Sequence, residues 1–239
     1  YLVGVSAGAF LISALVYVFA VKKLEKIGKL ALFTAIISLG VSMFSIWLDL
    51  GHPERAWRMV TNTNFNSMMG WMIWLYTAYF VLLVIELWFA LRADLVAWSA
   101  RGDFVGKLSQ FLTFGARAVS DKSLARDKLA LRVLGSLGVP LAVAFHGGVG
   151  ALFGVVGARP YWNTGLTPIM FLVGALLSGG ALLTFVTLVF GPERGSEEHK
   201  GTVLFLGQIV LGLLAFDVLL EWAEYSIGLY AALPAHAAS

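Results

Sequence analysis

Residues 2–21 of the chain read LVGVSAGAFLISALVYVFAV, a run of twenty residues without a charged side chain. A helix needs about 20 mostly apolar residues to cross the hydrocarbon core of a bilayer. Five further stretches of the sequence are mostly apolar over about the same length, although three of them contain acidic residues. We therefore predict an all-α, polytopic transmembrane bundle of about six spans, at about residues 2–21, 30–50, 68–91, 133–156, 166–190 and 203–229.

The composition of the whole chain agrees with this reading. Of its 239 residues, 59% are hydrophobic and 13% are charged, whereas a soluble domain is usually about one-quarter charged. This balance excludes a water-soluble globular enzyme and a disordered chain. The sequence has no cysteine, which excludes disulfides, haem attached through Cys-x-x-Cys-His and iron–sulfur clusters held by this sequence.

Basic residues are distributed unevenly between the two ends of the predicted spans. Of the 17, 14 lie after the first span, after the fifth span or in the connector at residues 92–132. The opposite side has only Arg55, Arg58 and Arg159. The positive-inside rule then places the basic segments in the cytoplasm of a bacterial or archaeal cell, with the protein in its inner membrane. No basic run indicates a nucleic-acid partner, so the expected surroundings are membrane lipids and other proteins.

We expect one integral membrane domain over residues 1–239. Within the cytoplasmic connector, residues 104–114 have the apolar spacing of an amphipathic surface helix. This helix is expected either to connect spans at the interface or to dock a cytoplasmic partner. The sequence begins at a membrane edge without Met and ends in an outer loop, so we expect it to be incomplete at both ends.

Ionisable side chains inside a bilayer are costly, and each one is a candidate functional residue. Asp217, Glu221 and Glu224 in the last span are spaced i, i+4 and i+7, which places them on one helix face. Mutual repulsion and desolvation both oppose their ionisation, which suits groups that exchange protons. Alternatively, Glu221 and Glu224 lie at the headgroup level and are simply solvated.

His146 lies near the middle of the fourth span, in the stretch AFHGGVG at residues 144–150. The neighbouring glycines allow a ligand or another backbone to approach closely. The imidazole could bind a ligand, or it could be a structural hydrogen-bonding group. The other three histidines lie in loops or tails, so a haem held by two histidines of this chain is not expected.

The second span carries a polar stripe with spacings of 4, 4, 3 and 4. Its members are Thr34, Ser38, Ser42, Ser45 and Asp49. Small hydroxyls suit helix packing, but the stripe could also form one wall of a hydrated proton path that ends near Asp49. Glu86, toward the cytoplasmic end of the third span, would be the inner mouth of that path or an interfacial group.

The outer loops read WLDLGHPERAW at residues 47–57, NFNSMMGW at residues 64–71 and ARPYWNT at residues 158–164. Asp49, Glu54, Arg55 and Arg159 could form an ion-pair network there. Alternatively, these loops hold turn and cap residues beside an aromatic belt.

These loops, together with GVSAGAF at residues 4–10 and HGG at residues 146–148, resemble the NrfD/PsrC family over about residues 1–190. Members of this family are the integral membrane subunits of polysulfide reductase, quinol-linked nitrite reduction and alternative complex III. Among the members of this family, the sequence most resembles the DsrP-like subunits of complexes linked to sulfite reduction. This resemblance would place the chain in sulfur metabolism.

The resemblance implies eight to ten helices and a site for quinone or quinol, either menaquinone or ubiquinone, near the outer face. It also implies no haem or metal in the chain. Electrons would pass between the quinone pool and an extracytoplasmic four-cluster iron–sulfur subunit, within a respiratory complex that could include a c-type cytochrome. The chain would be the quinone-reactive subunit, and the terminal substrate would react elsewhere in the complex.

Residues and resemblance together give a hypothesis for the site. The predicted pocket lies between the first, second, fourth and sixth spans, where His146 bonds a quinone oxygen and Asp217 or Glu221 exchanges its proton. Arg159 would bind the cofactor or organise the loops, and Ser38, Ser42, Ser45, Asp49 and Glu86 would form the proton path. The partner-facing residues would be Glu54, Arg55, Asn64, Trp162 and Asn163.

Two rival functions also fit a chain with buried carboxylates and polar stripes. One is a secondary transporter or proton channel without redox chemistry, although the clear internal repeat of many transporters is not visible. The other is a passive anchor that holds partners at the membrane.

Overall fold

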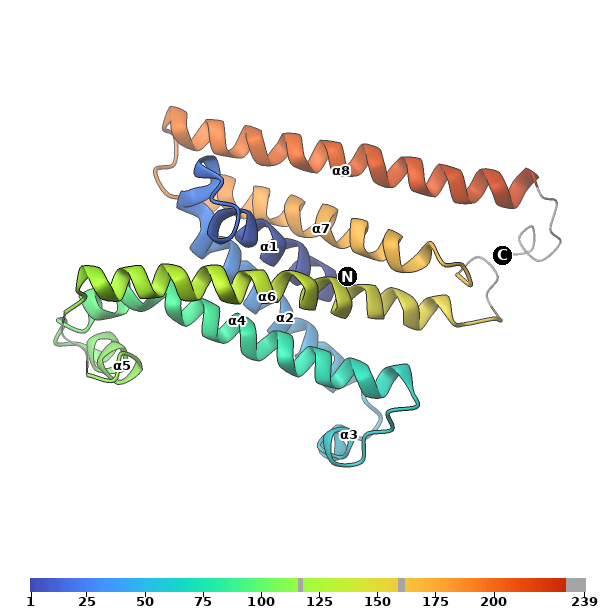
Figure 1. The fold of residues 1–239 in the computed structure, drawn as a ribbon, viewed down its shortest axis with the longest axis horizontal. Helices are drawn as coiled ribbons and strands as arrows, with labels where there is room; N and C mark the ends of the chain where they lie inside the picture. Colours follow the sequence, from blue (N-terminus) through green and yellow to red (C-terminus); the bar gives the residue numbers. More distant parts are fainter. Residues whose placement is uncertain (116–117, 159–161, 231–239) are drawn as a thin grey trace.

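A computed structural model describes residues 1–115, 118–158 and 162–230 of the chain. Within these ranges it is helical and contains no strand (Figure 1). The α-helices are α1 (Leu2–Tyr17), α2 (Gly28–Asp49), α3 (Arg58–Thr61), α4 (Met68–Trp98), α5 (Phe104–Leu112), α6 (Asp121–Gly154), α7 (Thr167–Phe190) and α8 (Glu197–Tyr230). Two short 3-10 helices complete the set, η1 (Lys22–Ile27) and η2 (Pro53–Arg55).

The prediction of an all-α membrane bundle is confirmed. Four segments of the described chain are long and apolar enough to cross a bilayer, namely Lys22–Asp49, α6, α7 and α8. The other two predicted spans correspond to α1, which is apolar but has 16 residues, and to α4, which has 31 residues. The expected number of about six spans is therefore consistent with the structure.

Two helices extend well beyond their predicted spans. At their inner ends, α4 continues to Trp98 and α6 already begins at Asp121, so much of the predicted connector continues the spans. Arg92 of α4 joins the two extensions, because its guanidinium pairs with Asp127 of α6 at 2.9 Å and also bonds the Ser123 hydroxyl. Hydropathy detects only the part of a helix that lipid surrounds, and these polar contacts hold the rest.

The long helices run side by side, and α1 lies at the centre (Figure 1). It packs on α2, α6 and α7, whereas α8 lies at one edge and packs on α7 and η1. We call the end with the N-terminus of α1 the outer end and the end with η1 the inner end, after the predicted orientation. The long helices run roughly horizontally in Figure 1, so the plane of a bilayer that they cross would be roughly perpendicular to that direction.

Helices α1 and α7 approach one another through glycines. A Cβ atom on Gly179 would lie 2.6 Å from Cα of Gly8 and 2.7 Å from the backbone nitrogen of Ala9. Apolar side chains gain little by leaving lipid for protein, so spanning helices associate through close van der Waals contact of small residues. The stretch from Gly4 to Ala9 consists of small residues apart from Val5, and all of it is buried.

Aromatic rings fill the space between α1, α4 and α6. Tyr79 of α4 meets Phe10 of α1 edge-on at 5.7 Å between ring centroids and stacks on Phe145 of α6 at 5.3 Å. All three rings are buried. These contacts fix the orientation of α1, α4 and α6 about their own axes. The orientation of the helices in turn positions the polar groups described below.

The contact between α1 and α7 gives a first testable prediction. Replacement of Gly179 by Ala should lower the free energy of unfolding by about 1–3 kcal/mol, because the new methyl group meets backbone atoms that cannot turn aside. The thermal midpoint in detergent, followed by intrinsic fluorescence, measures the effect. Gly174→Ala on the same helix is the matched control, since a Cβ there meets no atom within 4 Å. Equal midpoints for both variants would contradict the proposed packing.

Candidate functional site

His146 of α6 is buried in the outer half of the bundle, with 5% of its surface exposed. Its Nδ1 atom has no hydrogen-bond partner among the described residues. The ring fits because Gly4 of α1 has no side chain, since a Cβ there would lie 3.1 Å from Cε1 of the imidazole. The Phe171 ring of α7 lies 6.4 Å away between centroids. The imidazole also interacts with the backbone of Phe171, so Nδ1 is the ring nitrogen that lacks a partner in the described chain.

The residue that follows His146 on α6 is not covered by other side chains. A Cβ built on the next residue, Gly147, would meet no atom within 4 Å. The aromatic ring of Phe171 and the unpartnered ring nitrogen are compatible with a flat aromatic ligand that accepts or donates one hydrogen bond. Such a mostly apolar site with a few placed polar groups is the usual form of a cofactor pocket.

Further buried polar groups lie inward of His146. The hydroxyl of Tyr79 donates to the carbonyl oxygen of Ser6 at 3.3 Å, and the Ser6 hydroxyl oxygen has no partner in the described chain. Neither residue has measurable exposure. They lie between α1 and α4, next to the ring of Phe145.

Glu86 of α4 is the deepest carboxylate of the described chain. It is completely buried, and neither of its oxygens has a hydrogen-bond partner there. It faces α6 at Gly135, where a Cβ would lie 3.5 Å from Oε1. The structure thus places Glu86 in the protein interior rather than at a solvated interface. Along α6, Gly135 and His146 are eleven residues apart, which corresponds to about 16 Å.

We call Ser6, Tyr79, Glu86 and His146 the buried polar column. It runs between α1, α4 and α6 from the outer half of the bundle toward the inner end. The sequence reading found His146 and Glu86 but missed Ser6 and Tyr79. A signal was available for Tyr79, since it precedes Glu86 by seven residues and so shares its helix face.

The polar stripe of α2 is divided by the structure. Thr34, Ser38 and Ser42 are buried, whereas Ser45 and Asp49 at the outer end are exposed. The hydroxyls of Thr34 and Ser45 donate to carbonyl oxygens of their own helix, at 2.9 Å and 2.8 Å. Only the inner part of the stripe therefore faces other helices.

The three carboxylates of α8 are not brought beside His146. Asp217 and Glu224 are partly exposed and Glu221 is exposed, and α7 lies between α8 and α6 (Figure 1). The predicted pocket between the first, second, fourth and sixth spans is therefore not assembled from these residues within the described chain. Spacing along a helix shows which residues share a face, but it does not show which helix that face meets.

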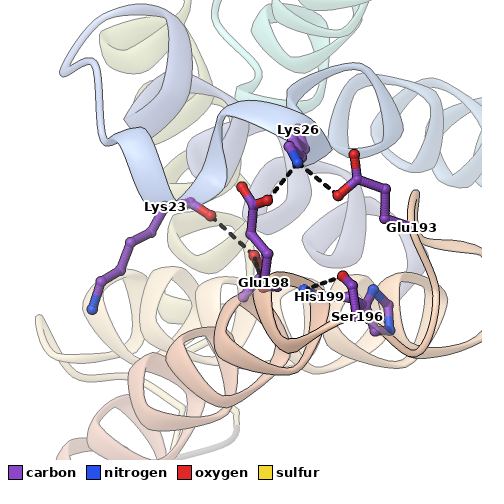
Figure 2. Close-up of polar contacts among 7 residues, drawn as sticks. Lys23, Lys26, Glu193, Ser196, Glu198 and His199 are labelled. Atoms are coloured by element: carbon purple, nitrogen blue, oxygen red, sulfur yellow. Dashed lines mark hydrogen bonds and ion pairs between the residues drawn. The ribbon is translucent and has the colours of Figure 1, made fainter.

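Helix α8 is held at its inner end by a polar cluster (Figure 2). The ammonium of Lys26 in η1 pairs with Glu193 at 2.7 Å and with Glu198 at 2.6 Å. The hydroxyl of Thr202 also donates to the carbonyl oxygen of Lys23 at 3.2 Å. All these contacts join η1 to the end of α7 and the start of α8, which leaves the outer part of α8 with α7 as its main neighbour.

The outer loops support the turn-and-cap interpretation for the residues that the structure describes. Asn64 accepts a bond from the backbone nitrogen of Asn66 at 3.0 Å, and Asn163 donates to the carbonyl oxygen of Gly154 at 2.7 Å. The ring of Trp162 packs edge-on against Phe153 at 5.6 Å. These side chains shape the loops that a partner would meet.

The expected ion-pair network is formed only in part. Glu54 lies 3.6 Å from Nε of Arg55 and 3.1 Å from Nδ1 of His52, and all three are exposed. Asp49 is exposed and takes part in none of the ion pairs of the described chain. Arg159 lies outside the described residues. Exposed pairs of this kind contribute little to stability, so these charges are available for contacts with another surface.

Comparison with known proteins connects this geometry to a family. The family model of the polysulphide reductase NrfD matches residues 1–238. The chain is also similar to a selenate reductase subunit of Mesobacillus selenatarsenatis, with 41% identity over 237 residues that make up 96% of this chain and 55% of that protein.

Two further relatives have names that mention quinones. The chain is 30% identical over 215 residues to the Hdr-like menaquinol oxidoreductase integral membrane subunit of Archaeoglobus fulgidus, covering 90% of this chain and 46% of that protein. It is 22% identical over 239 residues to the menaquinone reductase integral membrane subunit of Nitratidesulfovibrio vulgaris, covering 97% and 53%. The chain thus spans about half the length of the curated relatives it matches.

The burial of Glu86 gives a second prediction. A buried polar group without a partner costs free energy, so Glu86→Leu should leave the thermal midpoint unchanged or raise it. Asp127→Leu is the control, and it should lower the midpoint because Arg92 would lose its partner. Thermal unfolding of both variants in detergent measures the difference. A clear loss of stability in Glu86→Leu would show that the carboxyl group is satisfied.

Proposed function

The chain belongs to the NrfD family of polysulphide reductase membrane proteins, and from this membership we propose that it is the quinone-interacting membrane part of a respiratory oxidoreductase. The observation that carries the proposal is the buried His146, whose Nδ1 atom has no partner in the described chain. The names of two relatives, a menaquinol oxidoreductase subunit and a menaquinone reductase subunit, support the same class of cofactor.

The residues around His146 fit a quinone ring. Nδ1 can bond a quinone oxygen, Phe171 offers an aromatic wall, and Gly4 leaves room for the imidazole itself. A bound quinol would supply two electrons and two protons. His146 would hold the oxygen in place and carry a proton at its ring nitrogen, while the apolar surroundings exclude water.

Asp217 and Glu221 are the proposed proton-exchanging groups on α8. They lie apart from His146 in the described chain, so they would act through a surface of α8 that the rest of a longer protein completes. That α8 exposes carboxylates within a helix apolar enough to span a bilayer supports this role. Arg159 remains a proposed contact to the cofactor.

The proposed electron partner is an extracytoplasmic iron–sulfur subunit with four clusters. It would dock on the outer end, where Glu54, Arg55, Asn64, Trp162 and Asn163 lie in or beside the loops. Electrons would leave to that subunit directly, since this sequence has no cysteine to hold a cluster. Relatives named as subunits of reductases support a multi-subunit complex, in which a c-type cytochrome could be a further member.

A proton path is a separate part of the proposal. Ser38 and Ser42 of α2 and the buried polar column could connect the quinone site with the inner end, with Glu86 as the inner group and Ser45 and Asp49 at the outer end. We place the basic inner end in the cytoplasm and the bundle in an inner membrane. Turnover would then move charge across the bilayer.

A transporter or proton channel without redox chemistry is the second candidate. The buried carboxyl group of Glu86 favours it, since such groups also mark ion pathways. The two candidates differ in their partners, because only the redox function requires an iron–sulfur subunit. Copurification of such a subunit with the full-length protein would separate them.

The quinone site gives a third prediction. In membranes that contain the whole complex, His146→Ala and Asp217→Asn should each slow quinol-driven reduction of the partner cluster, on the order of 10²-fold for a lost proton-transfer group. The matched controls are His199→Ala at the inner end and Glu224→Gln. Rapid-mixing spectroscopy of the cluster measures the rate. Wild-type rates in both His146→Ala and Asp217→Asn would overturn the site assignment.

The proton path gives a fourth prediction. Ser42→Val and Glu86→Gln should lower the number of protons moved per electron, because each removes a buried group that can pass a proton. A voltage-sensitive dye and a pH electrode in sealed vesicles measure the ratio during quinol turnover. Thr77→Val is the control, since its exposed hydroxyl bonds only its own helix at Ile73. An unchanged ratio in both test variants would count against this path.

A further inference from the structure

Helix α5 (Phe104–Leu112) runs across the bundle instead of along it. In Figure 1 it is drawn nearly end-on at the inner end, while α4 and α6 run across the view. The axis of α5 would therefore be roughly parallel to the surface of a bilayer that α4 and α6 cross. The orientation is that of a helix lying on a membrane, not of one crossing it.

The depth of α5 is set by its contact with α4. The indole nitrogen of Trp88 donates to the carbonyl oxygen of Leu112 at 2.9 Å, and the Trp88 ring lies 6.3 Å from that of Phe114. Trp88 is ten residues before the end of α4 at Trp98, or about 15 Å along its axis. The end of α5 therefore lies where the predicted span, at about residue 91, meets the interface.

Helix α5 turns small residues inward and large apolar residues outward. Gly106 and Ser109 are buried, and α5 packs on α4. Phe104 and Phe111 are each 78% exposed, and Leu108 lies between them on the same face. At 100° per residue this face points away from Gly106 and Ser109. The helix thus presents phenylalanine rings to its surroundings at the depth of the acyl boundary.

The charges around α5 are mainly positive. Arg101 precedes the helix and Lys107 lies within it, and the first turns of α6, which follows α5 in the chain, carry Lys122, Arg126 and Lys128. Of the neighbouring acidic groups, Asp103 caps α5 at the backbone nitrogen of Gly106, Asp127 pairs with Arg92, and Asp121 lies in the first turn of α6, where it favours the helix start. An apolar face bordered by basic side chains matches a bilayer surface that carries anionic headgroups.

We propose that α5 is an in-plane membrane helix that inserts Phe104, Leu108 and Phe111 into the leaflet at the inner end and binds anionic phospholipids through the basic residues around it. The apolar face continues the lipid-facing surface of α4, where Val81, Val84 and Ile85 are exposed one to two turns from Trp88. This continuity favours lipid over a soluble protein as the occupant. The proposal rests on the membrane bundle and does not depend on the quinone site.

The test uses single cysteines, placed in full-length protein in which any cysteine outside residues 1–239 has been replaced, since these residues contain none. The full-length protein with Phe111→Cys or Gln110→Cys carries a fluorescent label in vesicles of phosphatidylcholine and phosphatidylglycerol. Gln110 is exposed on the opposite side of α5 and is the matched control. The label at 111 should be quenched several-fold more by nitroxide-labelled lipid than the label at 110, whereas aqueous iodide should show the reverse order.

Two outcomes would overturn the proposal. One is equal access of iodide to both labels in vesicles. The other is a label at 111 that is shielded only after partner subunits bind, which would make this face a protein-docking surface. The role of charge is tested by a variant with Arg101→Glu and Lys107→Glu. In that variant, quenching at 111 should no longer increase with phosphatidylglycerol, and an unchanged dependence would exclude the proposed headgroup contacts.

Discussion

Close contact between small residues on α1 is the constraint on which the bundle depends. Within a bilayer, helices gain little from hiding apolar side chains from one another, so their backbones must come close enough for dispersion forces to act. Gly8 meets Gly179 of α7 in this way, and Gly4 leaves room for the imidazole of His146. The same short stretch therefore brings three helices together and creates the space in which a buried polar group can stand.

The helices could be predicted from sequence because the bilayer dictates their length and apolarity. The fifth predicted span, residues 166–190, differs from α7 by one residue at its start. Where charged residues resume, α4 and α6 continue as helices beyond the membrane spans, and Arg92 and Asp127 hold these extensions together. Such ion pairs join residues that are far apart in the sequence, so a local sequence pattern does not predict them.

Only those residues of the candidate site that are costly to place in a membrane, the ionisable ones, could be predicted from the sequence. His146 and Glu86 were visible because an ionisable group in an apolar run is rare. Tyr79 and Ser6 were not, because hydroxyl groups are ordinary in spanning helices. The proximity of Asp217 to His146 could not be judged from spacing, since it depends on α7 lying between their helices. Asn64 and Asn163 stood out in the loop sequence, and the structure shows that they bond the backbone there.

Pro140 lies inside α6, between the levels of Gly135 and His146. Proline has no amide hydrogen, so the carbonyl oxygen of Ser136 lacks its bond within the helix. A helix bends most easily where such a bond is missing. Helix α6 should therefore bend most easily between Gly135, which faces Glu86, and His146. A bend there would change the separation of the two groups while the packed segments on either side stayed rigid.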